Sequence, residues 1–346
     1  MVAVSEYATL GPVVTDWIQR HCVIPDGPHM GEPFVLTDEM VAFVNNFYAV
    51  DVKAQRWAFP RGAQLMRPQK WGKGPFSAAL ICAEAAGPVL PVFDENGELV
   101  SGRAWDTPWI QVTAVSEDQT ANVFRALLPM IQLSDSLNME IADTGLTRVN
   151  LPGGGYIEPV TASARSRLGQ RITFAVQDEV HSWVQTNGGL QLADNQRRNL
   201  AGMGGRFIET TNAYDPVENS VAQRTFENEP GVLLDDREPV AGSVRNKRER
   251  RKVLKQVYGD SWWVDLDRIE DEIDALVSHG DGAQAERFFL NRKIASEGAA
   301  FDVEAFKKLA KAKYRPAQGA VVVMGVDGAR HDDAIAVVAT EVKTGF

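Results

Sequence analysis

Arg67-Pro-Gln-Lys-Trp-Gly-Lys-Gly74 is the stretch that decides the fold, because an apolar run (residues 63–66) precedes it and an alanine-rich run (residues 76–86) follows it. A strand, a glycine-containing loop and a helix in this order can aim backbone N–H groups and a lysine at phosphate groups. Gly72 and Lys73 supply these features. The usual pattern is G-x-x-x-x-G-K-S/T, but here Arg67 replaces the first glycine, and Gly74 replaces the hydroxyl residue that would hold Mg²⁺. Taken alone, the loop fits a surface turn equally well.

Alternating strand-like and helix-like runs continue outward from this loop. Strands are expected at residues 63–66, 109–114, 172–176 and 207–211, and helices at residues 76–86 and 118–130. Strands separated by helices predict an α/β domain whose mainly parallel sheet is covered on both faces. Upstream, a short helix is expected at residues 13–21, and Thr37 is expected to cap a helix that begins near Asp38.

Polar residues follow two of the expected strands. Asp178 and Glu179 end the run Ile172-Thr-Phe-Ala-Val-Gln, and ligands bind at the carboxyl ends of strands in open α/β sheets. There Asp178 would hold Mg²⁺, and Glu179 would polarise the water that attacks a γ-phosphate. The segment Thr210-Thr211-Asn212 ends the next strand, where it could sense the γ-phosphate. Each group alone is also typical of an ordinary strand end.

The last third of the chain changes character. Helices are expected at residues 266–277, 283–292 and 303–312, and strands at residues 321–324 and 334–340. Asp327 follows the first of these strands, and Asp333 lies just ahead of the second. Clustered carboxylates bind the paired divalent ions of nucleases, although Asp and Gly are equally usual in a hairpin turn. The expected divisions are an approach segment (1–50), an ATPase domain (51–235), a helical linker (236–318) and an incomplete nuclease domain (319–346).

The order of these parts resembles the large subunits of tailed-phage terminases, DNA-packaging motors that join a helicase-like ATPase to a nuclease of RNase H-like fold. Softer features agree, at residues 36–37, 258–260 and 287–291. The resemblance implies a P-loop ATPase with a mainly parallel sheet flanked by helices. A small helical linker subdomain and the first hairpin of an RNase H-like nuclease domain would follow it.

The resemblance also implies a role for each candidate site residue. The residues that bind ATP would be Arg67, Gly72, Lys73 and Gly74. Asp178 would bind Mg²⁺, and Glu179 would act on the attacking water. ATP hydrolysis would be coupled to movement by Thr210, Thr211 and Asn212, and the nuclease metal ions would be bound by Asp327 and Asp333. Ring motors of this family are thought to place an arginine in a neighbouring subunit's site, where a guanidinium stabilises the transferring phosphoryl group. Arg167 is the first choice and Arg165 the second, although a solvated surface arginine is as good an interpretation of either.

The implied cofactors and partners follow from the family. ATP and Mg²⁺ would serve the ATPase site, and Mg²⁺ or Mn²⁺ a complete nuclease site. The partners would be double-stranded DNA, the portal protein, the small terminase subunit and further copies in a ring on the portal, the isolated chain being monomeric. The place of action would be the host cytoplasm, transiently on the procapsid. Because two strands cannot make a stable RNase H-like sheet, we expect a motor-domain fragment that does not cleave DNA.

Three departures from the family pattern matter. Gly74 lacks the Mg²⁺-binding hydroxyl, which Ser77, one helical turn on, is a candidate to replace. Met40 stands where an adenine-reading glutamine is often found, so base specificity is open. The remaining nuclease acids are absent from the sequence.

Composition fits an ordinary globular chain: 346 residues, 44% hydrophobic, 24% charged, with a net charge of −10. No apolar stretch is long enough to span a bilayer, and no basic-then-apolar signal opens the chain. Cys22 and Cys82 give no disulfide framework and favour a reducing compartment. Acidic overall charge disfavours nonspecific DNA binding, but a motor needs positive charge only along its DNA-facing surface.

Three further features allow more than one interpretation. The basic run at residues 245–252 would contact DNA phosphates or the portal, or would form a solvated helix face, which we favour slightly. His181 is expected to be structural. Trp262 and Trp263 are expected to lie in the linker core rather than to form a platform on which a base stacks.

Two rival functions remain open at the level of sequence. One is another nucleic-acid-dependent ATPase, such as a helicase, which would separate strands. The other is a non-hydrolysing assembly protein that docks on the portal, an interpretation that Gly74 supports. ATP turnover, with Glu179→Ala as control, separates the motor from the second rival.

Overall fold

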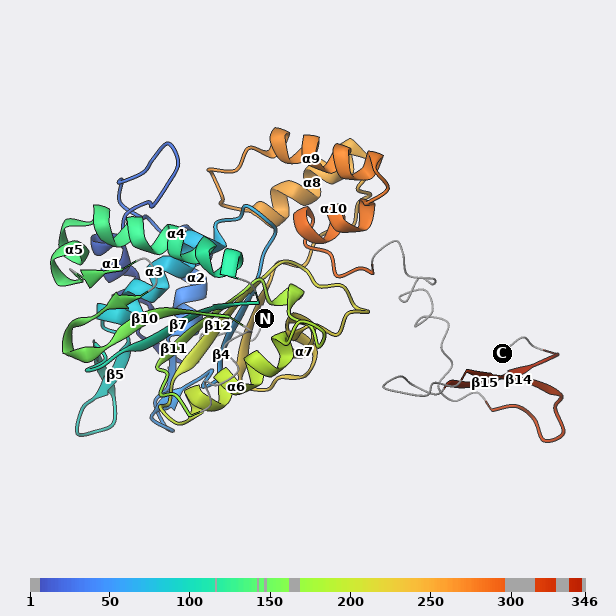
Figure 1. Cartoon of the computed structure of the whole chain (residues 1–346), viewed down its shortest axis with the longest axis horizontal. Coiled ribbons are helices and arrows are strands. Elements are labelled where there is room, and N and C mark those ends of the chain that lie inside the picture. The colour runs from blue at the N-terminus through green and yellow to red at the C-terminus, as the bar shows by residue number, and fades with distance from the viewer. Residues whose placement is uncertain are drawn as a thin grey trace. The chain divides into compact units, whose positions relative to one another are not determined.

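The computed structural model describes residues 7–115, 117–141, 143–145, 148–161, 169–295, 315–327 and 336–343. The chain divides into two compact units, residues 1–298 and residues 299–346 (Figure 1). Within the described residues, no helix is both long and apolar enough to traverse a bilayer.

The first unit is built on an eight-stranded sheet with the order β13-β4-β12-β11-β7-β10-β9-β8. Its strands are β4 (Gly62–Met66), β7 (Trp109–Ala114), β8 (Asp143–Thr144), β9 (Val149–Asn150), β10 (Tyr156–Thr161), β11 (Phe174–Asp178), β12 (Arg206–Thr211) and β13 (Val232–Asp236). All pairings from β13 to β10 are parallel, and β9 and β8 add an antiparallel edge. The expected α/β fold with a mainly parallel sheet is confirmed, although β10 and β13 were not foreseen.

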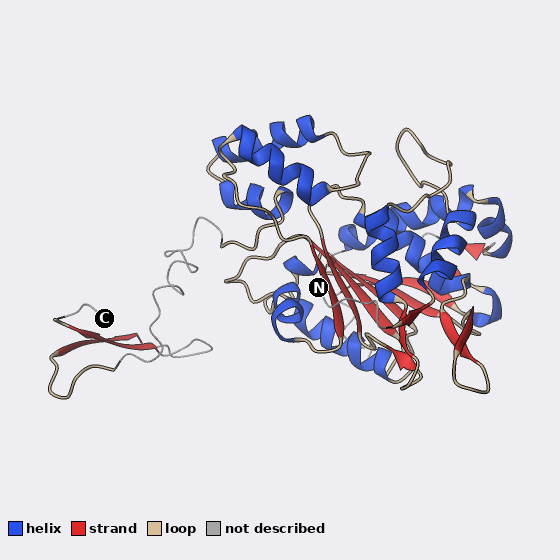
Figure 2. Cartoon of the chain, turned by 180° about the vertical axis from the view of Figure 1, so that it is seen from behind, coloured by secondary structure: helices blue, strands red, loops and turns tan. Residues whose placement is uncertain are grey.

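Helices cover both faces of this sheet (Figures 1 and 2). On one side lie α1 (Gly11–His21), α2 (Asp38–Phe47), α3 (Lys73–Ala86), α4 (Glu117–Leu133) and α5 (Asp135–Glu140); on the other lie α6 (Gly189–Ala201) and α7 (Val221–Asn228). Side chains alternate along a strand. Phe174 and Val176 therefore pack with α3, while Ala175 packs with Leu200 of α6 on the opposite face.

The N-terminal segment is part of the same core. Thr37 caps α2, its hydroxyl accepting a hydrogen bond from the Met40 amide at 3.4 Å. Apolar side chains of α1 and α2 belong to the hydrophobic cluster that contains α3. Cys22 and Cys82, far apart in sequence, meet there as free buried thiols, and their hydrogen bond together with burial raises the pKa of Cys22.

Two small sheets lie beside the large one. A three-stranded sheet comprises β1 (Ala8–Thr9), β2 (Ala49–Asp51) and β3 (Arg56–Trp57), and a hairpin comprises β5 (Leu90–Phe93) and β6 (Leu99–Arg103). Arg206, at the start of β12, is buried under the first of these sheets. Its guanidinium lies 3.7 Å from the ring centroid of Trp57 and 3.8 Å from Glu84.

A helical subdomain with its own hydrophobic core follows β13. It contains α8 (Lys247–Tyr258), α9 (Leu266–Ser278) and α10 (Gly282–Phe289), packed around residues such as Val253, Ile273 and Phe289. Asn246 caps α8 and Asp265 caps α9 through side-chain oxygens. The linker helices expected at residues 266–277 and 283–292 are thus present. The helix expected at residues 303–312 lies outside the described residues.

The described residues of the second unit form an antiparallel hairpin, β14 (Val322–Asp327) paired with β15 (Ala336–Glu341). The two expected strands are therefore present, and β14 ends at Asp327. Assignment of this hairpin to an RNase H-like domain stays a prediction, as do the four domain boundaries.

Candidate nucleotide-binding site

The phosphate loop, residues 67–74, joins β4 to α3. Gly72 has a φ of +104° and immediately precedes α3, whose first residue is Lys73. The Lys73 amine donates hydrogen bonds to the carbonyls of Arg67 (2.8 Å) and Pro68 (3.0 Å), and to the Asn212 side-chain oxygen (2.8 Å). The loop therefore wraps around its own lysine at the N-terminus of a helix, where anions bind favourably.

The acid pair lies at the same edge of the sheet. β12 separates β4 from β11, and all three strands are parallel, so their carboxyl ends meet. The Thr210 hydroxyl donates a hydrogen bond to the Asp178 carboxylate. Glu179 follows with a φ of +54°, a conformation that non-glycine residues seldom adopt. Such a turn is characteristic of functional sites.

Burial and charge oppose each other in this cluster. Desolvation lowers the pKa of Lys73 to about 8, while the carboxylates of Asp178 and Glu179 act to raise it. Burial likewise raises the pKa of Asp178, against the effects of the Thr210 hydrogen bond and the Lys73 charge. The Lys73 amine therefore interacts electrostatically with both acids.

The end of β12 links the loop to the acid pair. The Thr211 carbonyl accepts a hydrogen bond from the Arg67 amide (3.1 Å), and the Thr211 hydroxyl accepts one from the His181 amide (3.1 Å). Together with the Lys73–Asn212 contact, these bonds place Thr210, Thr211 and Asn212 between the two halves of the site.

Arg67 points away from this cluster. Its side chain is 4% exposed, and its guanidinium bonds to the Asp235 carboxylate at 2.8 Å, with Glu39 at 3.8 Å. A phosphate contact would require these ion pairs to break. A role for Arg67 in binding ATP stays a prediction.

Three other candidates cannot be placed in this site. Arg165, Arg167 and Asp333 lie outside the described residues. The half-buried His181 ring packs edge-on against Phe288, with ring centroids 5.6 Å apart. Burial lowers the pKa of His181 to about 3, so the ring is neutral, in keeping with a structural role.

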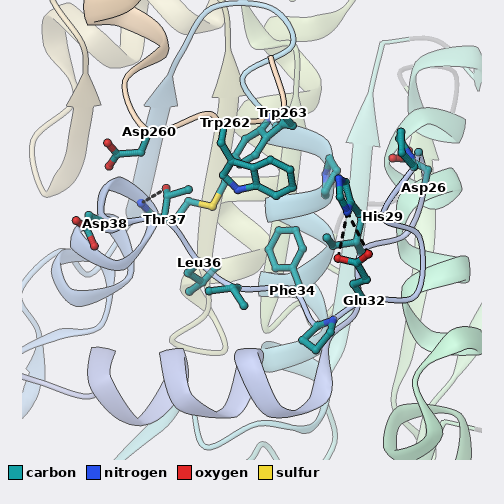
Figure 3. Close-up of a pocket in the computed structure, with 18 residues that line it drawn as sticks. Asp26, His29, Glu32, Phe34, Leu36, Thr37, Asp38, Asp260, Trp262 and Trp263 are labelled. Carbon is teal, nitrogen blue, oxygen red and sulfur yellow. Dashed lines mark hydrogen bonds and ion pairs between the residues drawn. The ribbon is translucent and has the colours of Figure 1, made fainter. Parts of the chain in front are cut away.

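An apolar pocket of about 540 Å³ opens beside the phosphate loop, with Gly72 in its wall. Figure 3 shows Trp262 and Trp263 on one side and Phe34 on the other. The two indoles are 62% and 38% exposed, so the expectation that they form linker core is wrong. Volume and lining suit a nucleobase-sized ligand, and Met40 also lines the pocket.

The helical subdomain holds the phosphate loop through four hydrogen bonds. The Tyr258 hydroxyl donates to the Gln69 carbonyl (2.7 Å), and the Gln69 amide donates to the Phe288 carbonyl (2.7 Å). The other two bonds run from the Trp263 indole to the Lys70 carbonyl (3.3 Å) and from the Ser261 hydroxyl to the Trp71 carbonyl (3.4 Å). Sequence reasoning missed this contact, because it depends on residues nearly two hundred positions apart.

The donor set suits Mg²⁺ bound together with phosphate rather than alone. No cluster of three metal-ligating side chains occurs among the described residues. Mg²⁺ characteristically uses one or two carboxylates with substrate phosphates and water, which Asp178 can satisfy. A Cβ added at Gly74 would meet nothing within 4 Å, and the buried Ser77 hydroxyl has no hydrogen-bond partner in the described structure.

A glycine–lysine loop between β4 and α3, with an acid pair at the end of β11, defines an α/β protein of the P-loop class. The fold is shared with the HK97 bacteriophage large terminase, whose crystal structure matches with a TM-score of 0.63 at 17% identity, over 98% of this chain and 66% of that one. In sequence, the chain is 26% identical over 177 residues to the terminase large subunit of Enterobacteria phage HK97, covering 49% of this chain and 30% of that protein. The chain is therefore similar to phage terminase large subunits in the sequence of about half its length and in its fold.

Two mycobacteriophage proteins match over more of the chain. The Gene 13 proteins of Mycobacterium phages D29 and L5 are each 31% identical over 357 residues, covering 90% of this chain and 59% of the relative. The chain thus spans about three fifths of the length of these relatives. No family model matches the sequence.

Proposed function

We propose that the chain is the ATP-hydrolysing motor of viral genome packaging and moves double-stranded DNA into a procapsid. The observation that carries this proposal is the convergence of Lys73, the acid pair and Asn212 at one edge of a parallel sheet. Relationship to terminase large subunits supports the same conclusion at the level of the family.

The triphosphate would bind at the phosphate loop, where the α3 N-terminus and the Lys73 amine face negative charge. Before nucleotide binds, the amine is held by carbonyls and by Asn212. The base of the nucleotide would occupy the apolar pocket beside the phosphate loop, where it would contact Trp262 and Phe34. Stacking is tolerant of base identity, so recognition would rest on the phosphates more than on the base edge.

Hydrolysis would require positioning and charge stabilisation more than covalent chemistry by the protein. Glu179 would orient the attacking water, and Asp178 would hold Mg²⁺ jointly with the phosphates. Bound Mg²⁺ would neutralise charge on the phosphate oxygens. Two guanidinium groups near this cluster, those of Arg67 and Arg287, already form ion pairs with Asp235 and Asp215.

Coupling would run through two routes. Asn212 shares a hydrogen bond with the phosphate-binding amine, so phosphate release alters the end of β12. The four bonds from the helical subdomain to residues 69–71 carry the same change to α8, α9 and α10. Movement of that subdomain would shift gripped DNA.

The proposed setting follows the family. Partners would be double-stranded DNA, the portal protein, the small terminase subunit and further copies of this chain in a ring. The motor would act in the host cytoplasm, docked on the procapsid. For the nuclease activity of the family, Asp327 and Asp333 would be the metal ligands.

The test is steady-state ATP turnover of the wild type and of Glu179→Gln, which keeps side-chain volume and removes the charge. Turnover should fall by at least two orders of magnitude, while binding of a fluorescent ATP analogue persists. Equal, background turnover by both proteins would refute the motor and leave a docking protein. DNA strand separation by the wild type would favour a helicase.

A further inference from the structure

The basic run at residues 245–252 is divided by the fold into two parts. One part is neutralised by acids of α9. Lys247 lies 3.1 Å from Asp274, Arg250 lies 2.7 Å from Asp274, and Arg251 lies 2.6 Å from Asp267 and 2.8 Å from Glu270. Buried Arg250 also approaches Glu270 at 3.4 Å. These three cations hold α8 against α9 and are not available to a partner.

Arg248 and Lys252 of the run are exposed, and together with Lys255, one turn further along α8, they form a row of cations that we call the α8 cationic face. Their spacing of four and three residues puts them on one side of the helix. The residues that α8 buries, including Val253 and Val257, lie on the opposite side. Within the part of the chain that the structure describes, no acid forms an ion pair with any of the three.

The nearest acid on the same helix is engaged elsewhere. The Glu249 carboxylate accepts hydrogen bonds from the Ser243 amide (2.8 Å) and the Asn246 side chain (3.0 Å), and so completes the N-terminal cap of α8. Arg245, just ahead of that cap, is exposed as well. The face is therefore locally positive on a chain whose net charge is −10.

We propose that the α8 cationic face binds the phosphate backbone of duplex DNA. Seven helical steps place the first and last cations about 10 Å apart, a span over which duplex DNA presents about six phosphate charges. The exposed large apolar residues of the described chain include none from α8. A protein partner characteristically needs such apolar anchors, whereas backbone binding needs flexible cations alone.

This inference rests on the proposed function, because that function supplies DNA as the partner. The inference adds that the α8 cationic face is the surface that contacts the DNA. The helical subdomain touches the phosphate loop through Tyr258, at the C-terminal end of α8, and it would touch DNA through the exposed cations of the same helix. A change at the nucleotide would then reach the DNA through one rigid element.

The experiment compares two triple variants that lower the charge equally. Arg248→Gln/Lys252→Gln/Lys255→Gln removes the face, and Lys53→Gln/Arg56→Gln/Arg198→Gln removes exposed cations of the sheet domain. Glutamine preserves helix propensity. Binding of a fluorescent duplex is measured by anisotropy across a series of salt concentrations, and ATP turnover without DNA is measured in parallel.

The slope of log affinity against log salt should become shallower by about 2.7 in the face variant, because each phosphate that a cation neutralises adds about 0.9 to the slope. The control variant should keep the wild-type slope. Equal slopes in the wild type and the face variant, or a wild type that does not bind duplex, would overturn the proposal. Retained DNA binding with loss of binding to an acidic partner protein would also overturn it.

The two proposals fail separately. DNA binding lost only in the face variant, with background ATP turnover in the wild type, keeps the α8 cationic face and refutes the motor. Normal turnover with an unchanged salt slope keeps the ATPase and refutes the face.

Discussion

Restoring a hydroxyl at the second residue of α3 should strengthen Mg²⁺-dependent ATP turnover. Gly74 occupies the position where the usual loop pattern has Ser or Thr. A Cβ built there meets no atom within 4 Å, so Gly74→Ser adds its side chain without displacing the protein. The change tests whether this loop handles a metal–phosphate complex in the manner that its pattern indicates.

The magnitude has two parts. Replacing glycine by serine inside a helix stabilises the fold by about 0.5 kcal/mol. A hydroxyl that contacts a charged group contributes about 1.5–3 kcal/mol, so half-saturating Mg²⁺ should fall about tenfold or more. The first part affects folding alone, and the second affects only the complex with nucleotide.

The assay is ATP turnover across a Mg²⁺ titration, with Gly74→Ala as the matched control. Alanine supplies the Cβ and an even larger gain in helix propensity, but no hydroxyl. We expect a lower half-saturating Mg²⁺ for the serine variant only. If serine and alanine shift the Mg²⁺ dependence equally, or if serine abolishes turnover, the reasoning about the open space at Gly74 is refuted.

Three further outcomes are expected. Nucleotide affinity should fall by up to tenfold per pH unit above about pH 8. Bound phosphate favours the charged amine of Lys73, and burial lowers the pKa of this amine to about 8. Isothermal titration calorimetry at several pH values checks this outcome. Gly72→Ala should lower the thermal midpoint, since a left-handed residue costs about 1–2 kcal/mol and its Cβ would lie 2.8 Å from the Trp263 ring. Arg206→Met should cost about 3–5 kcal/mol by leaving Glu84 buried without its cation, measured by denaturant unfolding.

Each outcome has a control. Lys73→Arg keeps its charge across this pH range, so any residual nucleotide binding should lose the decline above pH 8. The control for Gly72→Ala is Gly97→Ala, because Gly97 also has a positive φ but lies in the hairpin turn between β5 and β6. Comparison of the two variants separates the cost of backbone strain from the cost of the contact with Trp263. Exposed Arg198→Met should change stability by less than about 0.5 kcal/mol; a loss as large as that of Arg206→Met would contradict the argument from burial.

Local chemistry explains what could be predicted from the sequence. The strands that carry the site are short apolar runs followed at once by polar residues, and their parallel pairing places Lys73, Asp178 and Asn212 at one edge. Such patterns depend on neighbours in the chain, so strand ends and helix caps such as Thr37 were expected correctly. Strand β10 was missed because Pro159 interrupts its apolar pattern. Strand β13 was missed because its apolar run is only three residues long, Val232 to Leu234, before the acids Asp235 and Asp236 that complete the strand.

The sequence alone therefore determined the α/β class and the places of residues 67–74 and of the acid pair at the carboxyl ends of β4 and β11. Only the tertiary structure decided which partners the remaining side chains take. In the folded chain, Trp262 is exposed and lines a pocket together with Phe34, and Arg67 forms an ion pair with Asp235. Half of the cations in the basic run at residues 245–252 form ion pairs with acids of α9. The physical reason is that burial and ion pairing depend on contacts between residues far apart in the chain, and these contacts exist only once the helical subdomain has packed against the sheet domain.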